Sequence, residues 1–288
     1  MKADQLEPLL QGLKEYQDRI LEGLHHYYDE EKDRRQIQRY YAEIDFHLGS
    51  SREQFQLFHA LVRNTHNNRL PYFKSKDQYL YSWVDLQPDG RVKSIYSGEN
   101  SDPAELLKED LEVRKRLDEY DKYKNQPEEP AFSADLKFNA EHIVPQSWFG
   151  GREPMKGDLH HLFACEPSCN ASRSNFAYFD FPHYEPESPA EKIRNHCGVA
   201  SIEWFEPEYG KGTAARAMLY FMLRYPGEVR KPFRKNVNFN LLREWCDQFP
   251  PGLYEKHRNQ AIYEIQGNRN PFIDFPELAD TIYFPLRW

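Results

Sequence analysis

The stretch EHIVPQSW, from Glu141 to Trp148, places a carboxylate directly beside an imidazole. A neutral imidazole can take a proton from water near neutral pH, and a carboxylate can bind a hard cation. Neighbouring residues in a strand point to opposite faces, but at a twisted strand end or a bulge both can lean toward one point. The pair therefore indicates acid–base or metal chemistry at a strand that ends before Pro145.

More groups of this kind follow within the next thirty residues of the chain. They are Lys156, Asp158, His160, His161, Asn170 and Arg173. Each has an ordinary structural explanation when taken alone, because an adjacent Glu-His pair arises by chance in many chains of this length. No His-Glu-x-x-His is present, and CEPSC separates its cysteines by three residues, so the zinc-protease and zinc-deaminase signatures both fail.

The groups taken together resemble a known family. EHIVPQSWFG and MKGDLHHLFACEPSCNASRSNF are similar to the active-site segment of the endonuclease I family, bacterial metal-dependent nucleases of the His-Me finger (ββα-metal) class. RVKSIYSG resembles a strand upstream of that site, GKGTAARAMLYFMLRYP the family's central helix and AIYEIQGNRNPFID its C-terminal signature. These stretches cover most of residues 80–285 in the family's order, whereas residues 1–75 resemble it only loosely.

The resemblance implies a role for three residues of the motif. It makes His142 the general base, and it makes Glu141 and Asn170 the ligands of one Mg²⁺ ion, for which Mn²⁺ or Ca²⁺ can substitute. Ala140 stands where the family usually has Arg, so a phosphate contact from that position is missing. The implied reaction is hydrolysis of phosphodiester bonds in DNA and RNA, with little sequence preference, leaving 5′-phosphate ends.

The resemblance gives the remaining matched residues supporting roles. Asp158 and His160 match an Asp-Leu-His element, and we expect them to brace the site, with His161 pointing elsewhere. Arg173 either contacts phosphate or holds its helix. Lys156 is as compatible with a solvated role as with a phosphate contact.

The four cysteines leave three alternatives open. Cys165 and Cys169 are four residues apart and could share a helical face, and with Cys197 and Cys246 they could form a structural Zn²⁺ site. A disulfide and free thiols are the other two states.

The elements around the motif predict an α+β fold, with a mostly helical body, a small antiparallel sheet and a ββα-metal element over residues 136–178. We expect residues 1–75 to be helical, with a break near Gly49 and a cap at residues 51–53. QYLYSWVDL and VKSIYSG, separated by the turn QPDGR, predict a β-hairpin. One domain over residues 1–288 is expected.

GTAARAMLYFMLRYP is apolar nearly all round, which predicts a buried helix ending before Pro226. Arg216 and Arg224 lie on the same face of this helix. Buried arginines need anionic partners, so ion pairs are favoured for both over phosphate contacts.

The composition as a whole constrains the partners and the compartment. Hydrophobic residues make up 39% of the chain and the net charge is −8, so attraction to nucleic acid would have to be local, for example at RYPGEVRKPFRKN. We expect DNA and RNA as partners, no membrane, a monomer and, for an intracellular nuclease, a cognate inhibitor. The sequence as given shows no signal peptide, which predicts a cytoplasmic protein, with a trimmed secreted chain as the alternative.

Two alternative functions remain open. They are a nuclease selective for structured or single strands, and a catalytically weak nucleic-acid-binding protein of the same fold.

Overall fold

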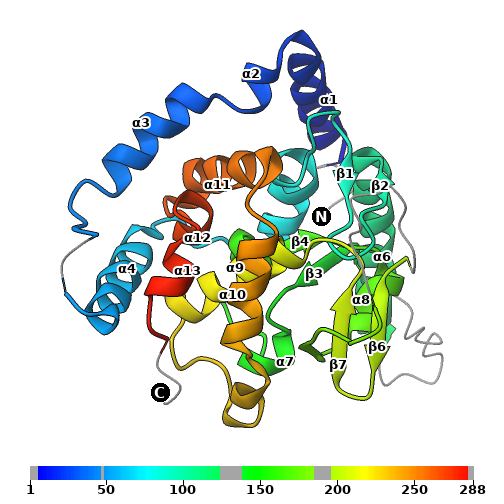
Figure 1. Ribbon diagram of the computed structural model, residues 1–288. Helices are drawn as coiled ribbons and strands as arrows, with labels where there is room; N and C mark the ends of the chain where they lie inside the picture. The colour runs from blue at the N-terminus through cyan, green and yellow to red at the C-terminus, as the bar shows by residue number, and fades with distance from the viewer. Residues whose placement is uncertain (1–5, 47–48, 124–137, 185–195, 285–288) are drawn as a thin grey trace.

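The computed structural model describes residues 6–46, 49–123, 138–184 and 196–284. Helices make up most of this part of the chain, and three small sheets lie among them (Figure 1). The prediction of an α+β fold with a mostly helical body is confirmed.

The α-helices are α1 (Leu6–Glu22), α2 (Leu24–Tyr27), α3 (Glu30–Tyr40), α4 (Ser51–Thr65), α5 (Tyr72–Lys74), α6 (Pro103–Tyr123), α7 (Gln146–Phe149), α8 (Pro167–Arg173), α9 (Lys211–Arg224), α10 (Phe239–Gln248), α11 (Leu253–Gln266), α12 (Pro271–Asp274) and α13 (Leu278–Thr281). A π-helix, η2, spans Ser75–Val84, and the 3-10 helices η3 and η4 span Leu159–His161 and Lys231–Asn236. The strands are β1 (Val92–Lys93), β2 (Asn100–Ser101), β3 (Ala140–His142), β4 (Leu162–Ala164), β5 (Ala177–Tyr178), β6 (Gly198–Ser201) and β7 (Trp204–Pro207).

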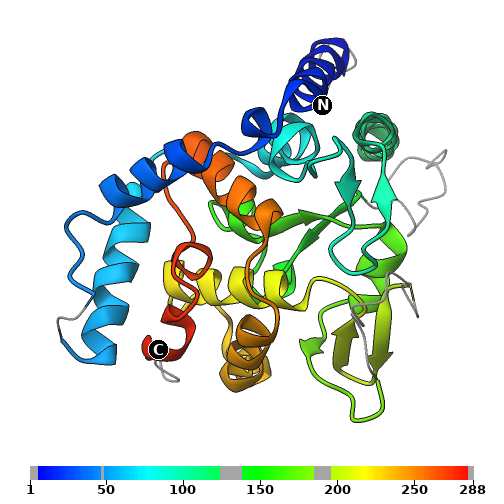
Figure 2. The ribbon, with the colours of Figure 1, turned by 45° about the horizontal axis from the view of Figure 1, so that its top comes forward.

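The N-terminal helices follow the sequence prediction closely. Helix α4 begins with a capping box, in which the Ser50 hydroxyl accepts from the backbone N–H of Glu53 and the Glu53 carboxylate accepts from the backbone N–H of Ser50. Helix α3 crosses α11 on the outside of the helical body (Figure 2), and Lys32 forms a 2.6 Å ion pair with Glu264 there.

The predicted hairpin is wrong in its first half. Residues 75–84 form the π-helix η2 instead of a strand, and η2 packs against α1, α6 and α11. Leu80, Tyr81 and Val84 are fully buried, so contacts with these helices outweigh the strand preference of the aromatic and β-branched residues. The QPDGR turn does reverse the chain, since Leu86 and Val92 form an antiparallel bridge.

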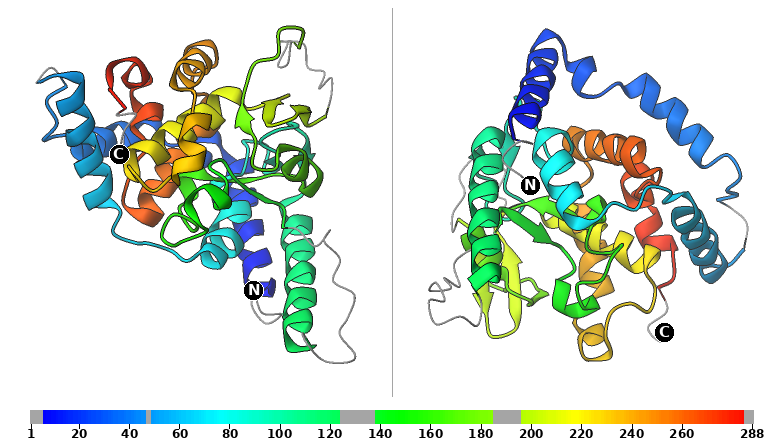
Figure 3. Two further views of the ribbon diagram at one scale, coloured as in Figure 1. Left: turned by 90° about the horizontal axis from the view of Figure 1, so that it is seen from below. Right: turned by 180° about the vertical axis from the view of Figure 1, so that it is seen from behind.

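Helix α9 lies in the middle of the helical body, and every residue of it except Thr213 is buried. It packs against α4, α10, α12 and η3, and it ends at Arg224, two residues before Pro226, as predicted. The two views in Figure 3 place α4 and α6 on opposite flanks of the molecule.

The small sheets are not all antiparallel. β1 pairs with β2 and β3 with β4 in antiparallel fashion, whereas the third sheet, in the order β5-β7-β6, contains a parallel β5–β7 pair. The β3–β4 hairpin lies between two hydrophobic cores: Phe163 belongs to the one around α9, while Leu162 and Ala164 belong to the one around η2. This alternation along one strand fixes the hairpin between both cores.

Candidate active site

A hairpin and a short helix carry the predicted site residues. In the hairpin, Glu141 is opposite Phe163 and His142 is opposite Leu162. Helix α8 follows β4 after two residues, and it begins with Pro167 at its first position. Two strands and a helix thus succeed each other in the described part of the predicted ββα element, residues 138–178.

His142 lies at the end of β3 and is held by the loop before η3. Its Nε2 lies 2.8 Å from the carbonyl oxygen of Lys156, and the ring of Tyr72 packs 5.2 Å from the imidazole ring, measured between centroids. A carbonyl oxygen only accepts, so Nε2 carries the proton and Nδ1 presents a lone pair. The amide of Gln146 reaches this Nδ1 at 3.3 Å.

Burial lowers the pKa of His142 to about 3, and the nearby His161 and Lys156 add to the effect, while the hydrogen bond to the Lys156 carbonyl opposes it. The imidazole is therefore neutral throughout the physiological range. A neutral ring whose Nδ1 lone pair is not committed to a strong donor can accept a proton from water.

Glu141 lies in a polar cluster and has other partners than His142. The hydroxyl of Tyr96 donates to its Oε1 at 2.9 Å, and Nε of Arg173 lies 3.4 Å from the same oxygen. The Tyr178 hydroxyl is 2.8 Å from that of Tyr96 and extends the cluster. Both side-chain contacts therefore fall on Oε1.

Burial raises the pKa of Glu141 to about 7, although Arg173, Tyr96 and the backbone of His142 oppose the rise. A buried carboxylate of this kind is stabilised in its charged form by a cation, which fits a metal ligand.

Asn170 is tied to the same strand from α8. Its Nδ2 donates to the carbonyl oxygen of Ala140 at 2.8 Å, which turns Oδ1 away from the strand backbone. An amide oxygen and the carboxylate of Glu141 are hard oxygen donors, so these residues fit a divalent cation such as Mg²⁺.

Asp158 is the centre of a buried hydrogen-bond network behind the site. Its Oδ2 accepts from the hydroxyls of Tyr220 at 2.7 Å and Tyr225 at 2.9 Å, and its Oδ1 accepts from Gln266 Nε2 at 3.0 Å. Oδ1 also accepts from the backbone N–H of His160, which caps η3. Asp158 thus fastens η3 to α9 and α11, the bracing role expected of it.

The expected direction of His161, pointing away from the site, is wrong. The ring of His160 points away from the site. Its centre lies 4.3 Å from that of the Tyr220 ring, and its Nε2 lies 3.1 Å from the Asn268 carbonyl oxygen. His161 instead lies 5.4 Å from the His142 ring, with Nε2 bonded to the Met155 carbonyl. Consecutive residues of a 3-10 turn project about 120° apart, so only one of the two can face the site.

Arg173 is buried completely and braces the hairpin. Its Nη2 donates to the carbonyl oxygen of Ile143 at 2.7 Å and its Nη1 to that of Ser174 at 3.1 Å. Of the two expected roles, this geometry fits the one of holding the helix. Lys156 is half-buried, with its ammonium 4.8 Å from the ring centre of Tyr72.

The cysteines adopt the disulfide alternative and not the four-cysteine zinc site. Cys169 on α8 is bonded to Cys197 beside β6, and Cys165 and Cys246 are separate buried thiols. His196 lies close to the bonded pair, but both sulfur atoms of that pair are already used. The disulfide attaches the helix that carries Asn170 to the β6–β7 hairpin.

Residues that the sequence did not single out complete the site. Tyr96 and Tyr178 surround Glu141, and Gln146 contacts His142. Gln146 comes four residues after His142, directly behind Pro145 in the motif, and Tyr96 lies in the matched strand RVKSIYSG. Position within the matched stretches was the one available signal for Tyr96, because its contacts with Glu141 and Tyr178 join residues that are distant in sequence.

Comparison with known proteins identifies the chain's relatives. An extracellular ribonuclease of Bacillus amyloliquefaciens is 34% identical over 161 residues, which is 51% of this chain and 54% of the relative. An extracellular deoxyribonuclease of Aeromonas hydrophila is 32% identical over 46% of this chain and 64% of the relative. A periplasmic deoxyribonuclease of the same species is 30% identical over 46% and 62%. The matches thus span between half and two thirds of these relatives' length.

The relatives contradict the expected compartment. All three are named as extracellular or periplasmic, so the expectation of a cytoplasmic protein is wrong. That expectation rested on the polar composition of the first residues alone, which does not determine where a folded protein works. Within the described residues, no helix combines the length and apolarity needed to cross a bilayer.

A family model describes most of the chain. The model of endonuclease I matches residues 53–277, which includes the β3–β4 hairpin, α8 and the central helix α9. The part outside the match is mainly α1 to α3, the region that resembles the family only loosely. The chain therefore belongs to the endonuclease I family.

Proposed function

We propose that the protein is a metal-dependent endonuclease that hydrolyses phosphodiester bonds in DNA and RNA. The orientation of His142 is the observation that carries this proposal. The Lys156 carbonyl holds the proton on Nε2, so Nδ1 carries the lone pair at a strand end that also carries Glu141. Among the described residues only the Gln146 amide reaches this Nδ1, at 3.3 Å, and an attacking water would replace it there. Family membership and the names of the relatives support the same reaction.

Each residue has a defined part in the hydrolysis. His142 Nδ1 takes a proton from the attacking water, which forms a bond to phosphorus while the bond to the 3′ oxygen breaks. Glu141 and Asn170 would hold Mg²⁺, which supplies positive charge near the phosphate and the leaving oxygen when bound. The leaving 3′ oxygen takes a proton from solvent water, so the products are a 3′ hydroxyl and a 5′ phosphate.

Broad substrate use follows from contacts to phosphate, which carry no sequence information. One similar protein is named a ribonuclease and another a deoxyribonuclease, which supports activity on both nucleic acids. The extracellular and periplasmic relatives and the Cys169–Cys197 disulfide support work in an oxidising compartment.

The test is cleavage of supercoiled plasmid and of a structured RNA, with Mg²⁺ or with EDTA. We expect wild type to nick and degrade the plasmid only with metal, and His142→Ala to lose that activity by orders of magnitude. His25→Ala is the matched control, because His25 is exposed on α2. A wild-type protein that retards the plasmid on a gel without cutting it would favour the alternative of a binding protein with this fold.

A further inference from the structure

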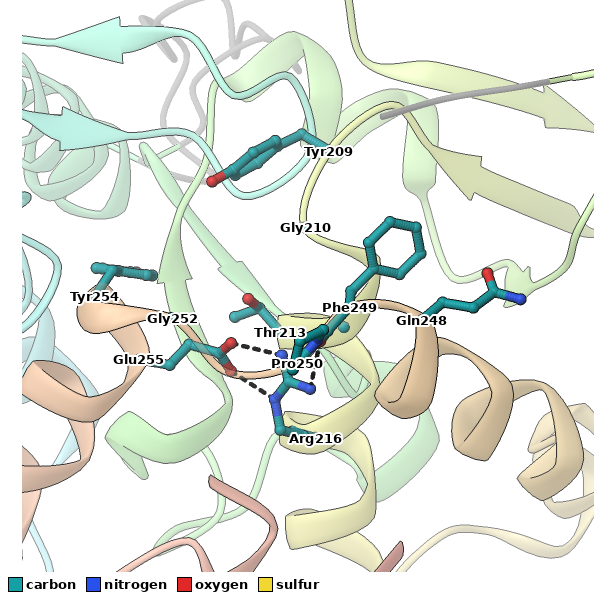
Figure 4. Close-up of a pocket in the computed structure, with 11 residues that line it drawn as sticks. Tyr209, Gly210, Thr213, Arg216, Gln248, Phe249, Pro250, Gly252, Tyr254 and Glu255 are labelled. Carbon is teal, nitrogen blue, oxygen red and sulfur yellow. Dashed lines mark hydrogen bonds and ion pairs between the residues drawn. The ribbon is translucent and has the colours of Figure 1, made fainter. Parts of the chain in front are cut away.

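The two arginines on the buried face of α9 have different surroundings. Arg216 forms a bidentate ion pair with Glu255, at 2.9 and 2.5 Å, and its Nη1 donates to the carbonyl oxygen of Phe249 at 2.7 Å. Figure 4 shows this pair inside a pocket of about 360 Å³. The charge of Arg216 is therefore neutralised within the protein, as the sequence predicted.

Arg224, two turns further along α9, contradicts that prediction. Its exposed fraction is 6%, and no hydrogen bond or ion pair joins it to any of the described residues. Its guanidinium lies 4.4 Å from the ring centre of Tyr225, which orients it without neutralising it. A buried cation without an anion is unfavourable, which makes Arg224 a candidate to receive a charged ligand.

Arg224 lines a pocket of about 260 Å³ that contains three more arginines. They are Arg63 at the end of α4, Arg69 in the loop that follows, and Arg152 after α7. Arg63 and Arg69 have no carboxylate partner in the part of the chain that the structure describes. Four cations converge on this pocket from three segments that are distant in sequence.

The two carboxylates of the same pocket are already engaged. Glu228 forms a 2.6 Å ion pair with Arg152. Glu153 accepts from the backbone N–H groups of Tyr72 and Gly157, each at 2.8 Å. Four guanidinium groups thus face two carboxylates, so the pocket keeps a net positive charge that can attract an anion.

The pocket continues toward the loop between α4 and α5. A neighbouring hollow of about 660 Å³ shares Arg63 and Arg69 with it and is also lined by Asn64, Asn67 and Asn68. Guanidinium and amide groups are the side chains that bind the oxygen atoms of phosphates and sugars. An extended sugar–phosphate chain fits such a row of donors better than a single small anion.

The pocket borders the catalytic segment directly. Met155 lines it, and the next residue, Lys156, supplies the carbonyl that holds His142. A nucleic acid strand that leaves the active site along residues 152–156 would enter the pocket.

We propose that this arginine pocket is a second phosphate subsite, which binds the backbone of the substrate strand beyond the scissile phosphate, with Arg224 at its base. The inference rests on the proposed nuclease function. It would also supply local positive charge in a chain whose net charge is −8 and whose Ala140 stands where the family usually has arginine.

The first test measures binding alone. In the inactive His142→Ala background with Mg²⁺, a fluorescein-labelled single-stranded 16-nucleotide DNA is titrated with protein at several salt concentrations. Arg224→Gln should weaken binding about tenfold, and it should reduce the slope of log K against log salt by about 0.7, the value for one lost phosphate contact on a single strand. Arg34→Gln, at an exposed position on α3, is the control and should match the parent.

Thermal unfolding distinguishes a role of Arg224 in stabilising the fold from a role in binding substrate. Arg224→Gln removes a buried charge without an anionic partner among the described residues, so it should leave the melting temperature unchanged or raise it. Arg216→Gln leaves Glu255 without its ion-pair partner and should lower the melting temperature. A melting temperature that falls for both variants would overturn the proposal, as would an Arg224→Gln variant with parental affinity and salt slope.

The second test uses cleavage. For Arg224→Gln in the active protein, kcat/KM should fall at least several-fold more on the 16-nucleotide DNA than on bis(p-nitrophenyl) phosphate, which is too short to reach the pocket. Equal losses on both substrates would overturn the subsite. A wild type that cuts neither substrate would overturn the proposed function, while the binding comparison would still decide the subsite.

Discussion

The imidazole Nε2 of His142 lies 2.8 Å from the carbonyl oxygen of Lys156, fourteen residues further along the chain. This contact selects the tautomer of the proposed base, because a carbonyl can only accept a hydrogen bond. Burial among Tyr72, Phe149 and His161 then keeps the ring neutral. The tautomer of His142 is therefore set by a loop that is fourteen residues away in sequence.

The hydroxyl of Tyr96 should matter for metal binding. Tyr96→Phe removes the 2.9 Å hydrogen bond to Glu141 Oε1 and leaves the ring in place. Loss of a hydrogen bond to a metal ligand costs about 10–100-fold in metal affinity or activity. We expect the Mg²⁺ concentration for half-maximal cleavage to rise by a factor in this range.

Tyr178→Phe is the matched comparison for that experiment. The Tyr178 hydroxyl contacts Tyr96 at 2.8 Å and reaches Glu141 through it. A smaller effect than that of Tyr96→Phe is expected. A Tyr96→Phe enzyme with the wild-type Mg²⁺ requirement would contradict the role given to Glu141.

The disulfide should stabilise both the fold and the site. Cys169 and Cys197 are 28 residues apart, for which a cross-link contributes on the order of 3–4 kcal/mol by restricting the unfolded chain. Dithiothreitol should lower the urea midpoint of wild type and reduce its activity, because α8 carries Asn170. A Cys169→Ala/Cys197→Ala variant should show both losses already and no further response to dithiothreitol, since the remaining thiols are buried and unpaired.

Replacing one partner of the Arg216–Glu255 ion pair should destabilise the protein more than replacing both. Arg216→Met leaves Glu255, which is 4% exposed, as an unpaired buried charge, and should destabilise the protein by about 3–5 kcal/mol. The double variant Arg216→Met/Glu255→Leu should recover much of this loss in urea unfolding. A double variant no more stable than Arg216→Met would mean that the hydrogen bond to Phe249 dominates.

Buried histidines should make the fold sensitive to acid. Burial lowers the pKa of His160 to about 3, with contributions from Arg258 and His66, while Asp158 and the Asn268 carbonyl oppose the shift. In the unfolded chain the His160 imidazole takes up a proton near pH 6.5, and in the folded protein it does so only near pH 3. The stability that the neutral ring contributes is therefore complete above pH 6.5 and is lost as the pH falls toward 3.

The expected size of this effect is about 2 kcal/mol for one histidine between pH 7 and pH 5. His160→Gln removes the titrating group and keeps an amide that can donate to Asn268. Its free energy of unfolding should fall by about 2 kcal/mol less than that of wild type over this range. Parallel curves for the two proteins would show that His160 does not titrate differently in the folded and unfolded states.

Local patterns determined much of the fold. The capping box at Ser50 and Glu53, the buried helix α9 and its end before Pro226 all depend on residues close together in sequence. Helix caps and hydrophobic periodicity act over a few residues, so they can be read without the tertiary structure. The π-helix η2 could not be read in this way, because contacts with three other helices decide its conformation.

The same division holds for the site. The segment from Glu141 to Arg173 contains the proposed base, both proposed metal ligands and the brace Asp158, so the sequence alone determined which residues to consider. Only the tertiary structure decided that His161 and not His160 faces His142 and that Cys169 pairs with Cys197. It also decided that Arg216 has an anionic partner, whereas Arg224 has none among the described residues. Each of these depends on a partner brought near by packing, and a side chain's direction and charge state follow from that partner.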